Sequence, residues 1–324
     1  MKYVTIPQTE LKVSQICLGS ADFGASIPRK ETFALLDAFV AAGGNFIDTA
    51  HVYSDWIPNT KSTSEKTIGY WLRDSGMRQD VVIGTKGAHP LLTSMNQSRL
   101  SPEDIQTDVK ESLEYLQTGH IDLYWLHRDD TAIPVGEIID ALNEQADKGR
   151  ITQFGCSNWQ FSRIQEALDY AARKGVQSFV GNQPLWSLAA VDMNAIPDKT
   201  LVGMDDEGSV FHKRTGMAVI PYTSQAKGFF SKLDAKGADG ITEGDKKVYL
   251  SEANQQRLPR VQKLAREHGV GVNEIALAYL TNQPFVTVPV IGPKNVGQLQ
   301  SSLKAADVKL TSQELAYLEN GSSY

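Results

Sequence analysis

The chain has 324 residues, of which 41% are hydrophobic and 22% are charged, as in an ordinary globular enzyme. Its formal charge of −6 argues against electrostatic binding to nucleic acid, which needs an excess of Lys and Arg on one face. No apolar run approaches the length of about 18 residues that predicts a membrane-spanning helix, and the first residues lack the pattern of a signal peptide. We therefore expect a cytoplasmic protein with neither membrane nor nucleic-acid partners.

The two cysteines, Cys17 and Cys156, both lie in apolar runs typical of buried strands. Two buried thiols in a chain of this length fit a reducing compartment better than a disulfide-stabilised secreted protein. We expect both to be free.

Apolar runs of strand length alternate with helix-like segments along nearly the whole chain. In these runs the apolar residues are consecutive rather than alternating, which is typical of parallel strands buried on both faces. The predicted strands are Ile16–Gly19, Asn45–Thr49, Val81–Lys86, Ile121–His127, Ile151–Ser157, Phe179–Pro184, Ala218–Tyr222 and Val286–Ile291.

The helices between the predicted strands have recognisable ends. The segment Glu31–Ala42 ends at a Gly pair, and Ser101 is an N-cap followed by Pro at the first helical position. A later helix ends at Gly269, and Thr311 begins a capping box that opens the last helix.

Two segments fall outside this alternation. Residues 2–13 predict a hairpin that covers the bottom of a barrel, and residues 223–249 predict a long polar loop. Long loops in compact domains are usually functional or mobile.

Eight strands in 324 residues give roughly 40 residues per strand–helix unit, which favours a single (β/α)₈ TIM barrel domain over residues 1–324. A doubly wound sheet is the main alternative. Against it, the first predicted strand is not followed by G-x-G-x-x-G, and the sequence contains no G-x-x-x-x-G-K-[ST].

Active sites of such barrels lie at the carboxyl ends of the strands. The polar residues at these ends are Asp48, Lys86, His127, Ser157, Asn158, Gln183 and Tyr222, and Tyr53 follows in the loop after Asp48. The six histidines form no H-x-H or H-E-x-x-H motif, so we expect no metal site. Glycosidase chemistry needs two facing carboxylates, and only Asp48 is well placed.

Seven stretches in this order resemble the aldo-keto reductases, in particular the bacterial and potassium-channel-β-like branch. They are Gly44–Tyr53, Ser64–Gly69, Gly84–Lys86, Ile121–His127, Gly155–Asn158, Asn182–Gln183 and Pro221–Tyr222. The resemblance covers essentially the full length and implies reversible hydride transfer between a nicotinamide cofactor and a carbonyl or alcohol.

The resemblance implies a catalytic tetrad of Asp48, Tyr53, Lys86 and His127. An unperturbed phenol has a pKa near 10, which makes it a reluctant proton donor and a reluctant base. We expect Lys86 to lower the pKa of Tyr53, Asp48 to hold Lys86 charged, and His127 to position the carbonyl oxygen.

The resemblance also implies a set of cofactor contacts. The nicotinamide carboxamide is expected at Ser157, Asn158 and Gln183, with Tyr222 stacked on the ring. The remaining expected contacts are Gly19, Ser20, Ala21, Asp48, Thr223, Ser224, Gln225, Lys227, Gly228, Gly292, Lys294, Gln298 and Ser302.

Cofactor choice depends on Lys294, which is placed to meet a 2′-phosphate and favours NADP, with NAD as the second choice. The chain departs from the family in two places. The loop Thr223–Gly228 replaces the usual Ser-Pro-Leu, and Ser301-Ser302 replaces the Glu-Asn pair that contacts adenine.

The substrate pocket is expected to be walled by Phe23, Trp56, Trp159 and Trp186. The loop Trp56–Thr63 carries Asn59, Lys61 and Ser62, which indicates a sugar or polyol among the carbonyl and alcohol substrates considered. The alternative function is a cofactor-sensing regulatory subunit, because some relatives bind NADP tightly and serve channels. The sequence does not indicate an oligomeric state.

Overall fold

A computed structural model describes residues 1–58 and 60–324. Eight parallel strands form one sheet in the order β10-β3-β4-β5-β6-β7-β8-β9. The strands are β3 (Cys17–Gly19), β4 (Phe46–Asp48), β5 (Val82–Gly87), β6 (Ile121–Leu126), β7 (Ile151–Ser157), β8 (Gly181–Gln183), β9 (Ala218–Val219) and β10 (Val290–Ile291).

The sheet closes on itself between β9 and the segment that leads into β10. The Val219 amide donates to the Val286 carbonyl at 2.9 Å, and the Val288 amide donates to the Val219 carbonyl at 2.8 Å. The expected (β/α)₈ barrel is therefore confirmed.

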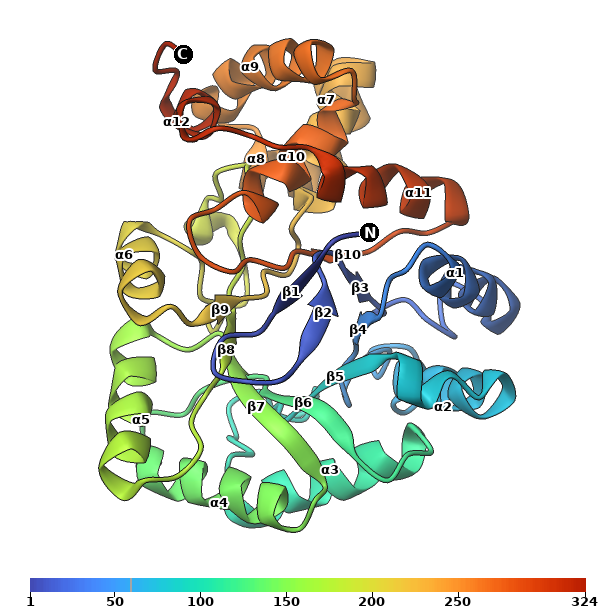
Figure 1. Cartoon of the computed structure of the whole chain (residues 1–324), viewed down its shortest axis with the longest axis vertical. Helices are drawn as coiled ribbons and strands as arrows, with labels where there is room; N and C mark the ends of the chain where they lie inside the picture. The colour runs from blue at the N-terminus through green and yellow to red at the C-terminus, as the bar shows by residue number, and fades with distance from the viewer. Residues whose placement is uncertain (59) are drawn as a thin grey trace.

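Helices surround the strands (Figure 1). They are α1 (Arg29–Ala41), α2 (Thr63–Ser75), α3 (Pro102–Tyr115), α4 (Val135–Asp147), α5 (Phe161–Lys174), α6 (Asp206–Thr215), α7 (Phe229–Lys236), α8 (Glu243–Tyr249), α9 (Glu252–His268), α10 (Val272–Thr281), α11 (Val296–Lys304) and α12 (Ser312–Asn320). Short 3₁₀ turns lie at Met77–Asp80, Met193–Ala195, Ala226–Gly228, Gly237–Gly240 and Ala305–Asp307.

The first two strands, β1 (Tyr3–Thr5) and β2 (Lys12–Ser14), form an antiparallel hairpin that lies across the centre of the ring in Figure 1. Ile6 and Val13 are fully buried and belong to the same apolar cluster as Trp125 of β6. The hairpin thus closes one end of the barrel, and the carboxyl ends of the strands open at the other.

Several strands are shorter than their apolar runs. Phe179 and Val180 are buried, yet the regular ladder of β8 begins only at Gly181. Beyond β9, pairing continues only as isolated bridges, such as the one between Leu185 and Tyr222. Apolar runs therefore mark burial, while the ladder ends where the chain turns toward a loop.

Residues 223–249 are not the long loop that their glycines and charges predict. They contain α7 and α8, each preceded by a 3₁₀ turn. Phe229, Phe230 and Tyr249 are buried in the cluster that packs α7 against α9 and α10. The side chain of Thr242 caps α8 by accepting from the Asp245 amide at 3.2 Å. Burial of these aromatic rings outweighs the unfavourable helix propensity of the glycines.

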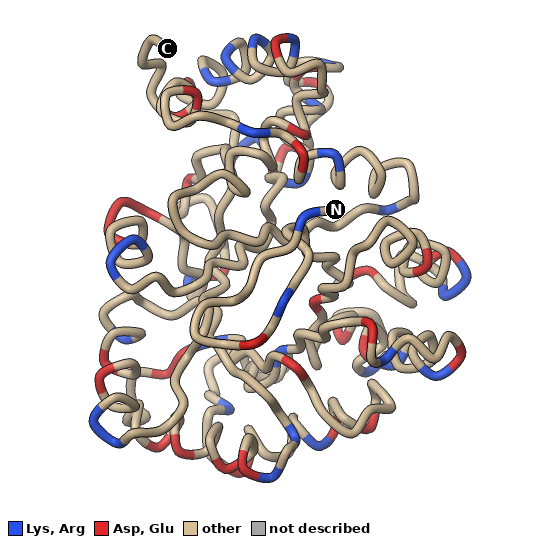
Figure 2. Tube along the Cα trace, in the orientation of Figure 1, with Lys and Arg blue, Asp and Glu red and all other residues tan. Residues whose placement is uncertain are grey.

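Positive and negative side chains are interspersed over the outer helices (Figure 2). Cys17 and Cys156 are both buried and free. Across residues 1–58 and 60–324, no helix combines the length and apolar character that a membrane crossing requires.

Candidate active site

Four polar residues meet at the carboxyl ends of neighbouring strands. Asp48 ends β4, Lys86 lies near the end of β5, and His127 follows β6 directly. Parallel pairing puts these strands side by side, with Asp48 opposite Gly84 and Lys86 opposite Trp125. Tyr53 reaches the group from the loop after β4, with its ring centre 4.9 Å from the Lys86 Nζ atom.

The Lys86 ammonium is buried and makes two hydrogen bonds. It donates to Asp48 Oδ2 and, at 2.8 Å, to the carbonyl oxygen of Thr49. The other carboxylate oxygen of Asp48 accepts from Gln183 Nε2 at 2.8 Å. Asp48 and Lys86 are each about 2% exposed or less, so the pair is held by hydrogen bonds on both sides of the carboxylate.

The pKa values of Tyr53 and Lys86 are set by opposing effects. Burial raises the pKa of the Tyr53 phenol, and the nearby Lys86 charge offsets this only in part. Lys86 therefore lowers the pKa of Tyr53 as expected, but the effect of burial is larger and the net pKa is raised. Burial alone would lower the pKa of Lys86, but Asp48 and Tyr53 together outweigh burial, so the pKa is raised and the side chain stays cationic.

His127 is a neutral imidazole beside this pair. Burial, followed by the charge of Arg128, brings its pKa well below the ordinary value. Its ring lies 6.0 Å from the Tyr53 ring and 4.7 Å from the His89 ring. The Nδ1 atom of His127 is buried, and none of the described residues hydrogen-bonds to it.

The next strand ends form a connected polar floor. Ser157 Oγ donates to the Gln183 carbonyl at 2.9 Å, and the Tyr222 hydroxyl donates to Asn158 Oδ1 at 2.7 Å. Asn158 has φ near +60°, a left-handed turn that Asn tolerates, and its amide nitrogen donates to the His127 carbonyl at 3.3 Å. This network ties Tyr222 through Asn158 to the backbone of His127.

One unsatisfied atom on this floor bears on cofactor binding. Gln183 Oε1 is buried and accepts no hydrogen bond from any residue within 1–58 and 60–324. A buried acceptor without a donor costs free energy, and the N–H of a carboxamide would satisfy it. The residues present therefore fit a nicotinamide.

A cavity of about 1160 Å³ adjoins the four polar residues, and Tyr53 lies in its wall. This exceeds the roughly 300–1,000 Å³ usual for small-molecule sites and is large enough for a dinucleotide. Among the expected cofactor contacts, those lining the cavity are Gly19, Ser20, Ala21, Tyr222, Thr223, Ser224, Gln225, Lys227, Gly228, Gly292, Lys294, Gln298 and Ser302. Asp48, Ser157, Asn158 and Gln183 are buried in the polar network rather than in the cavity wall.

The family model for the aldo/keto reductase family matches residues 15–321. The chain belongs to this family. It is 30% identical to YrpG, an uncharacterized oxidoreductase of Bacillus subtilis, over 99% of this chain and 95% of that protein. It is 28% identical to the aryl-alcohol dehydrogenase (NADP(+)) of Phanerodontia chrysosporium, over 97% of this chain and 84% of that protein.

A solved structure has the same fold as this aldo-keto reductase. The crystal structure of the thermostable aldo-keto reductase Tm1743 superposes with a TM-score of 0.72, covering 98% of this chain and 99% of that one at 24% identity. At the level of the family, the chain is an oxidoreductase acting on carbonyls and alcohols, and aldo-keto reductases use nicotinamide cofactors.

Of the three lysines that line the reductase cavity, Lys227 and Lys294 have different settings. The Lys227 ammonium lies 3.0 Å from Asp245 Oδ1 of α8, so an ion pair already engages the cation expected near the phosphates. Lys294 is exposed at the start of α11, where Asn295 caps the helix by accepting from the Gln298 amide at 3.0 Å. Lys294 thus stands beside a helix N-terminus, a location that favours anions.

The expected substrate walls divide into two pairs. Phe23 lines the cavity, and Trp56 is 54% exposed, with its ring inclined at 65° to the Tyr53 ring and 6.3 Å between the ring centres. Trp159 instead is fully buried, donates to the Arg128 carbonyl at 3.1 Å and packs against Phe179.

This placement corrects the expectation for Trp159, because the left-handed turn at Asn158 carries the following ring into the core. Trp186 also lies outside the cavity lining, packed between Tyr279 and Phe285.

Two of the polar residues in the loop Trp56–Thr63, on which the expectation of a sugar substrate rested, make hydrogen bonds within the protein. Lys61 donates to Glu111 Oε2 at 2.8 Å, and the Ser62 hydroxyl donates to the His51 carbonyl at 2.6 Å. Asn59 lies outside the described residues. Neither Lys61 nor Ser62 therefore supports a sugar site.

Sequence reasoning missed several cavity residues, and most carried no signal. Asn273 of α10 and Lys232 of α7 belong to helices with no recognised motif, while Asn295 could have been found as an N-cap before Val296. His89 is a single histidine without a motif, and only the structure brings its ring against His127. Across the described ranges, no group of three or more His, Cys, Asp or Glu is arranged to hold a metal ion.

Proposed function

We propose that the chain is an NADP(H)-dependent reductase that interconverts a carbonyl and an alcohol, with Tyr53 as the proton donor and acceptor. The observation that carries this proposal is the buried Lys86 ammonium, held by Asp48 on one side and facing the Tyr53 ring on the other. We assign this activity to a single domain over residues 1–324 in the cytoplasm. The two buried free thiols support a reducing compartment.

When bound, the nicotinamide cofactor supplies the hydride to the carbonyl carbon. Tyr53 gives its phenolic proton to the carbonyl oxygen, and the fixed positive charge of Lys86 stabilises the phenolate that remains. Neutral His127 directs the carbonyl oxygen toward Tyr53 by hydrogen bonding. In the reverse direction the Tyr53 phenolate takes the proton of the alcohol.

Three features support a dinucleotide with a 2′-phosphate. The cavity volume suits a dinucleotide, and Gln183 Oε1 needs a donor of the kind that a carboxamide offers. Lys294 and Lys232 add positive charge to the cavity wall. The name of the Phanerodontia chrysosporium relative, which includes NADP(+), agrees with this choice.

The loops around the catalytic end favour an apolar substrate. Trp56 after β4, and Leu91, Leu92 and Met95 after β5, are each at least 40% exposed. Exposed apolar side chains on the loops that follow catalytic strand ends favour apolar ligands. We therefore propose aryl aldehydes and ketones before sugars, and the name of the aryl-alcohol dehydrogenase relative points the same way.

The test is a turnover screen of the purified full chain with aryl aldehydes, aryl ketones and sugars, each with NADPH and with NADH. Loss of absorbance of the reduced nicotinamide measures activity. We expect turnover with NADPH, fastest with an aryl aldehyde. Absence of turnover with either cofactor, together with very slow exchange of bound nucleotide, would instead favour the cofactor-sensing subunit.

A further inference from the structure

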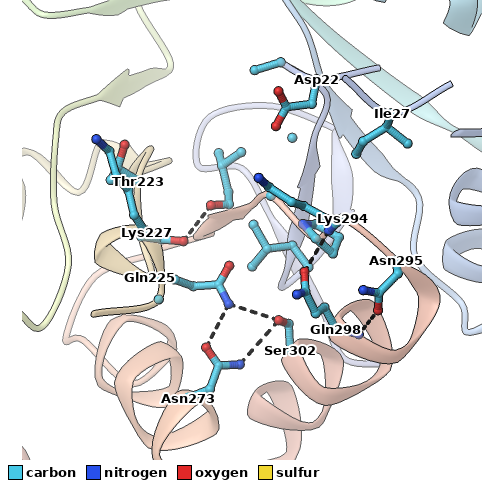
Figure 3. Close-up of a pocket in the computed structure, with 18 of the residues that line it drawn as sticks. Asp22, Ile27, Thr223, Gln225, Lys227, Asn273, Lys294, Asn295, Gln298 and Ser302 are labelled. Atoms are coloured by element: carbon cyan, nitrogen blue, oxygen red, sulfur yellow. Dashed lines mark hydrogen bonds between the residues drawn. The ribbon is translucent and has the colours of Figure 1, made fainter. Parts of the chain in front are cut away.

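A second histidine, His89, packs against His127, with 4.7 Å between the ring centres and the ring planes inclined at 65°. The cavity proposed for the dinucleotide (Figure 3) has Tyr53 in its wall but neither His127 nor His89. The two imidazoles therefore lie outside the space proposed for the cofactor, next to the place where a carbonyl would meet Tyr53. The proposed mechanism uses His127 and gives His89 no role.

The surroundings of His89 decide which of its ring nitrogens accepts a hydrogen bond. Nδ1 lies 2.6 Å from the carbonyl oxygen of Pro90, which only accepts, so Nδ1 carries the proton. Burial, followed by the charge of Arg128, lowers the pKa of His89 to about 4, so the ring is neutral at pH 7 and Nε2 is an acceptor.

This acceptor is free to meet a ligand. No residue within 1–58 and 60–324 hydrogen-bonds to Nε2 of His89. The buried side-chain atoms that lack a partner include Nδ1 of His127 but not Nε2 of His89, and His89 keeps 8% of its surface exposed. Nε2 therefore borders open space at the catalytic end of the barrel.

The backbone before His89 is held in an unusual conformation. Ala88 has φ near +58°, a left-handed value that is uncommon for a residue with a Cβ atom. Its amide donates to Oδ2 of the buried Asp108 at 2.8 Å, and Asp108 is in turn paired with Arg99. Such strained residues persist where the surrounding structure fixes them, and they cluster at functional sites. The turn at Ala88 sets the direction in which the chain enters His89.

We propose that Nε2 of His89 accepts a hydrogen bond from a substrate hydroxyl, so that the site selects carbonyl compounds with a hydroxyl group on the neighbouring carbon. This inference rests on the proposed function and narrows its substrate class. Because the rings of His127 and His89 are in contact, the two oxygens that they bind must be close together in the ligand. A carbonyl oxygen and a hydroxyl on adjacent carbons meet this condition.

The charges around His89 favour a neutral ligand over a carboxylate. Arg128 is the nearby cation, and each of its guanidinium nitrogens is already engaged. They donate to Thr200 Oγ1 at 2.8 Å, to the His127 carbonyl at 2.8 Å and to Asp198 Oδ2 at 3.0 Å. A neutral imidazole beside a neutralised guanidinium offers an anion little, whereas a hydroxyl needs only an acceptor.

The position of His89 in the chain agrees with the apolar substrate proposed above. His89 begins the loop that displays Leu91 and Leu92, which are 55% and 41% exposed. An aryl group on the leucines and a hydroxyl on His89 are compatible within one small molecule. An analogue without the hydroxyl donor would leave the His89 acceptor unpaired, which is the usual basis for rejecting such analogues.

The experiment compares hydroxymethyl phenyl ketone with methoxymethyl phenyl ketone, each with the purified full chain and NADPH. The two ketones share the skeleton around the carbonyl, but only the first donates a hydrogen bond. We expect kcat/KM of the wild type to be about 2- to 12-fold higher for the hydroxy ketone, the range of one neutral hydrogen bond. His89→Phe keeps an aromatic ring and removes the acceptor, so it should lower this ratio by the same factor.

The ratio separates binding of the hydroxyl from a structural role, because both ketones are measured on one preparation and misfolding lowers both rates equally. His89→Gln places a carboxamide oxygen near the position of Nε2 and should restore part of the preference. His120→Phe is the matched control, since His120 precedes β6 at the end opposite His127, and its ratio should equal that of the wild type. If His89→Phe fails to fold, His89→Leu gives the same readout.

Three results would overturn the role of His89 while leaving the proposed function intact. They are a wild-type ratio near one, a ratio that loss of the acceptor leaves unchanged, and reduction of benzaldehyde with no reduction of either ketone. Failure of the wild type to reduce any of the three compounds with NADPH would overturn both proposals.

Discussion

The two ends of the cavity are built on different principles. At the catalytic end, Asp48, Lys86 and Gln183 are buried, and each polar group locks the next in place. At the far end, Lys294 and Asn295 are exposed and project from the start of a helix. In such a buried hydrogen-bond network, replacing one residue type leaves its partners without hydrogen bonds and disrupts the whole network. This chain departs from the family pattern at the far end, in the loop Thr223–Gly228 and at Ser301-Ser302.

The largest effect is expected at the catalytic end. Tyr53→Phe removes one oxygen and keeps the ring, so turnover should fall by about 10²–10⁴-fold, the usual contribution of general acid–base catalysis. The dissociation constant for NADPH should stay within about twofold. Steady-state kinetics and calorimetry check both, with Tyr70→Phe on α2 as the control. Retention of more than a tenth of the activity would mean that another residue supplies the proton.

At the far end we expect a smaller and more selective loss. Lys294→Ala should weaken NADP binding by about 10- to 150-fold, the range of a charge-assisted contact, while NAD binding changes little. Lys304→Ala, an exposed lysine at the other end of α11, is the matched control. Equal losses for the two nucleotides would show that Lys294 does not contact a 2′-phosphate.

A buried histidine that contacts β8 beneath the catalytic end should make the stability of the fold sensitive to acid. His212 is buried, donates through Nδ1 to the Met217 carbonyl at 3.0 Å and accepts through Nε2 from Asn182 of β8 at 3.4 Å. Burial lowers its pKa to about 4. The unfolded chain, with a His pKa near 6.5, therefore binds the proton first, and stability falls as pH drops from 6.5 toward 4.

At pH 5 this one histidine should cost about 2 kcal/mol of the free energy of unfolding relative to pH 7. Urea unfolding of the wild type and of His212→Gln at both pH values measures the effect. The variant lacks the titrating group, so its stability should fall less between pH 7 and pH 5. Equal acid losses in the two proteins would contradict the assignment of the proton to His212.

The sequence predicts the catalytic end better than the rest of the cavity for a physical reason. Strand ends are marked by apolar runs, and parallel pairing alone brings Asp48, Lys86 and His127 together. The direction in which an aromatic side chain points is not encoded so simply. Trp159 enters the core directly after the left-handed turn at Asn158.

Contacts between helices that are far apart in the chain also cannot be predicted from sequence patterns alone. Asn273 carries no motif, and it joins the cavity only because α10 packs beside α11. The glycines at 237, 240 and 244 make residues 223–249 look like a loop in the sequence. The burial of Phe229 and Phe230 nevertheless makes the segment helical. Tertiary packing here overrides local propensity.

The cavity draws its wall from the two ends of the chain, residues 19–27 and residues 222–302, with Tyr53 between them. A ribosome that has released only the first two hundred residues has made most of the strands but little of this wall. A ligand stabilises only those states of the chain in which its binding site is formed. A dinucleotide would therefore stabilise the complete barrel but not the partly synthesised or partly folded chain. Nucleotide binding would therefore stabilise the protein only late in its folding, after α11 has formed.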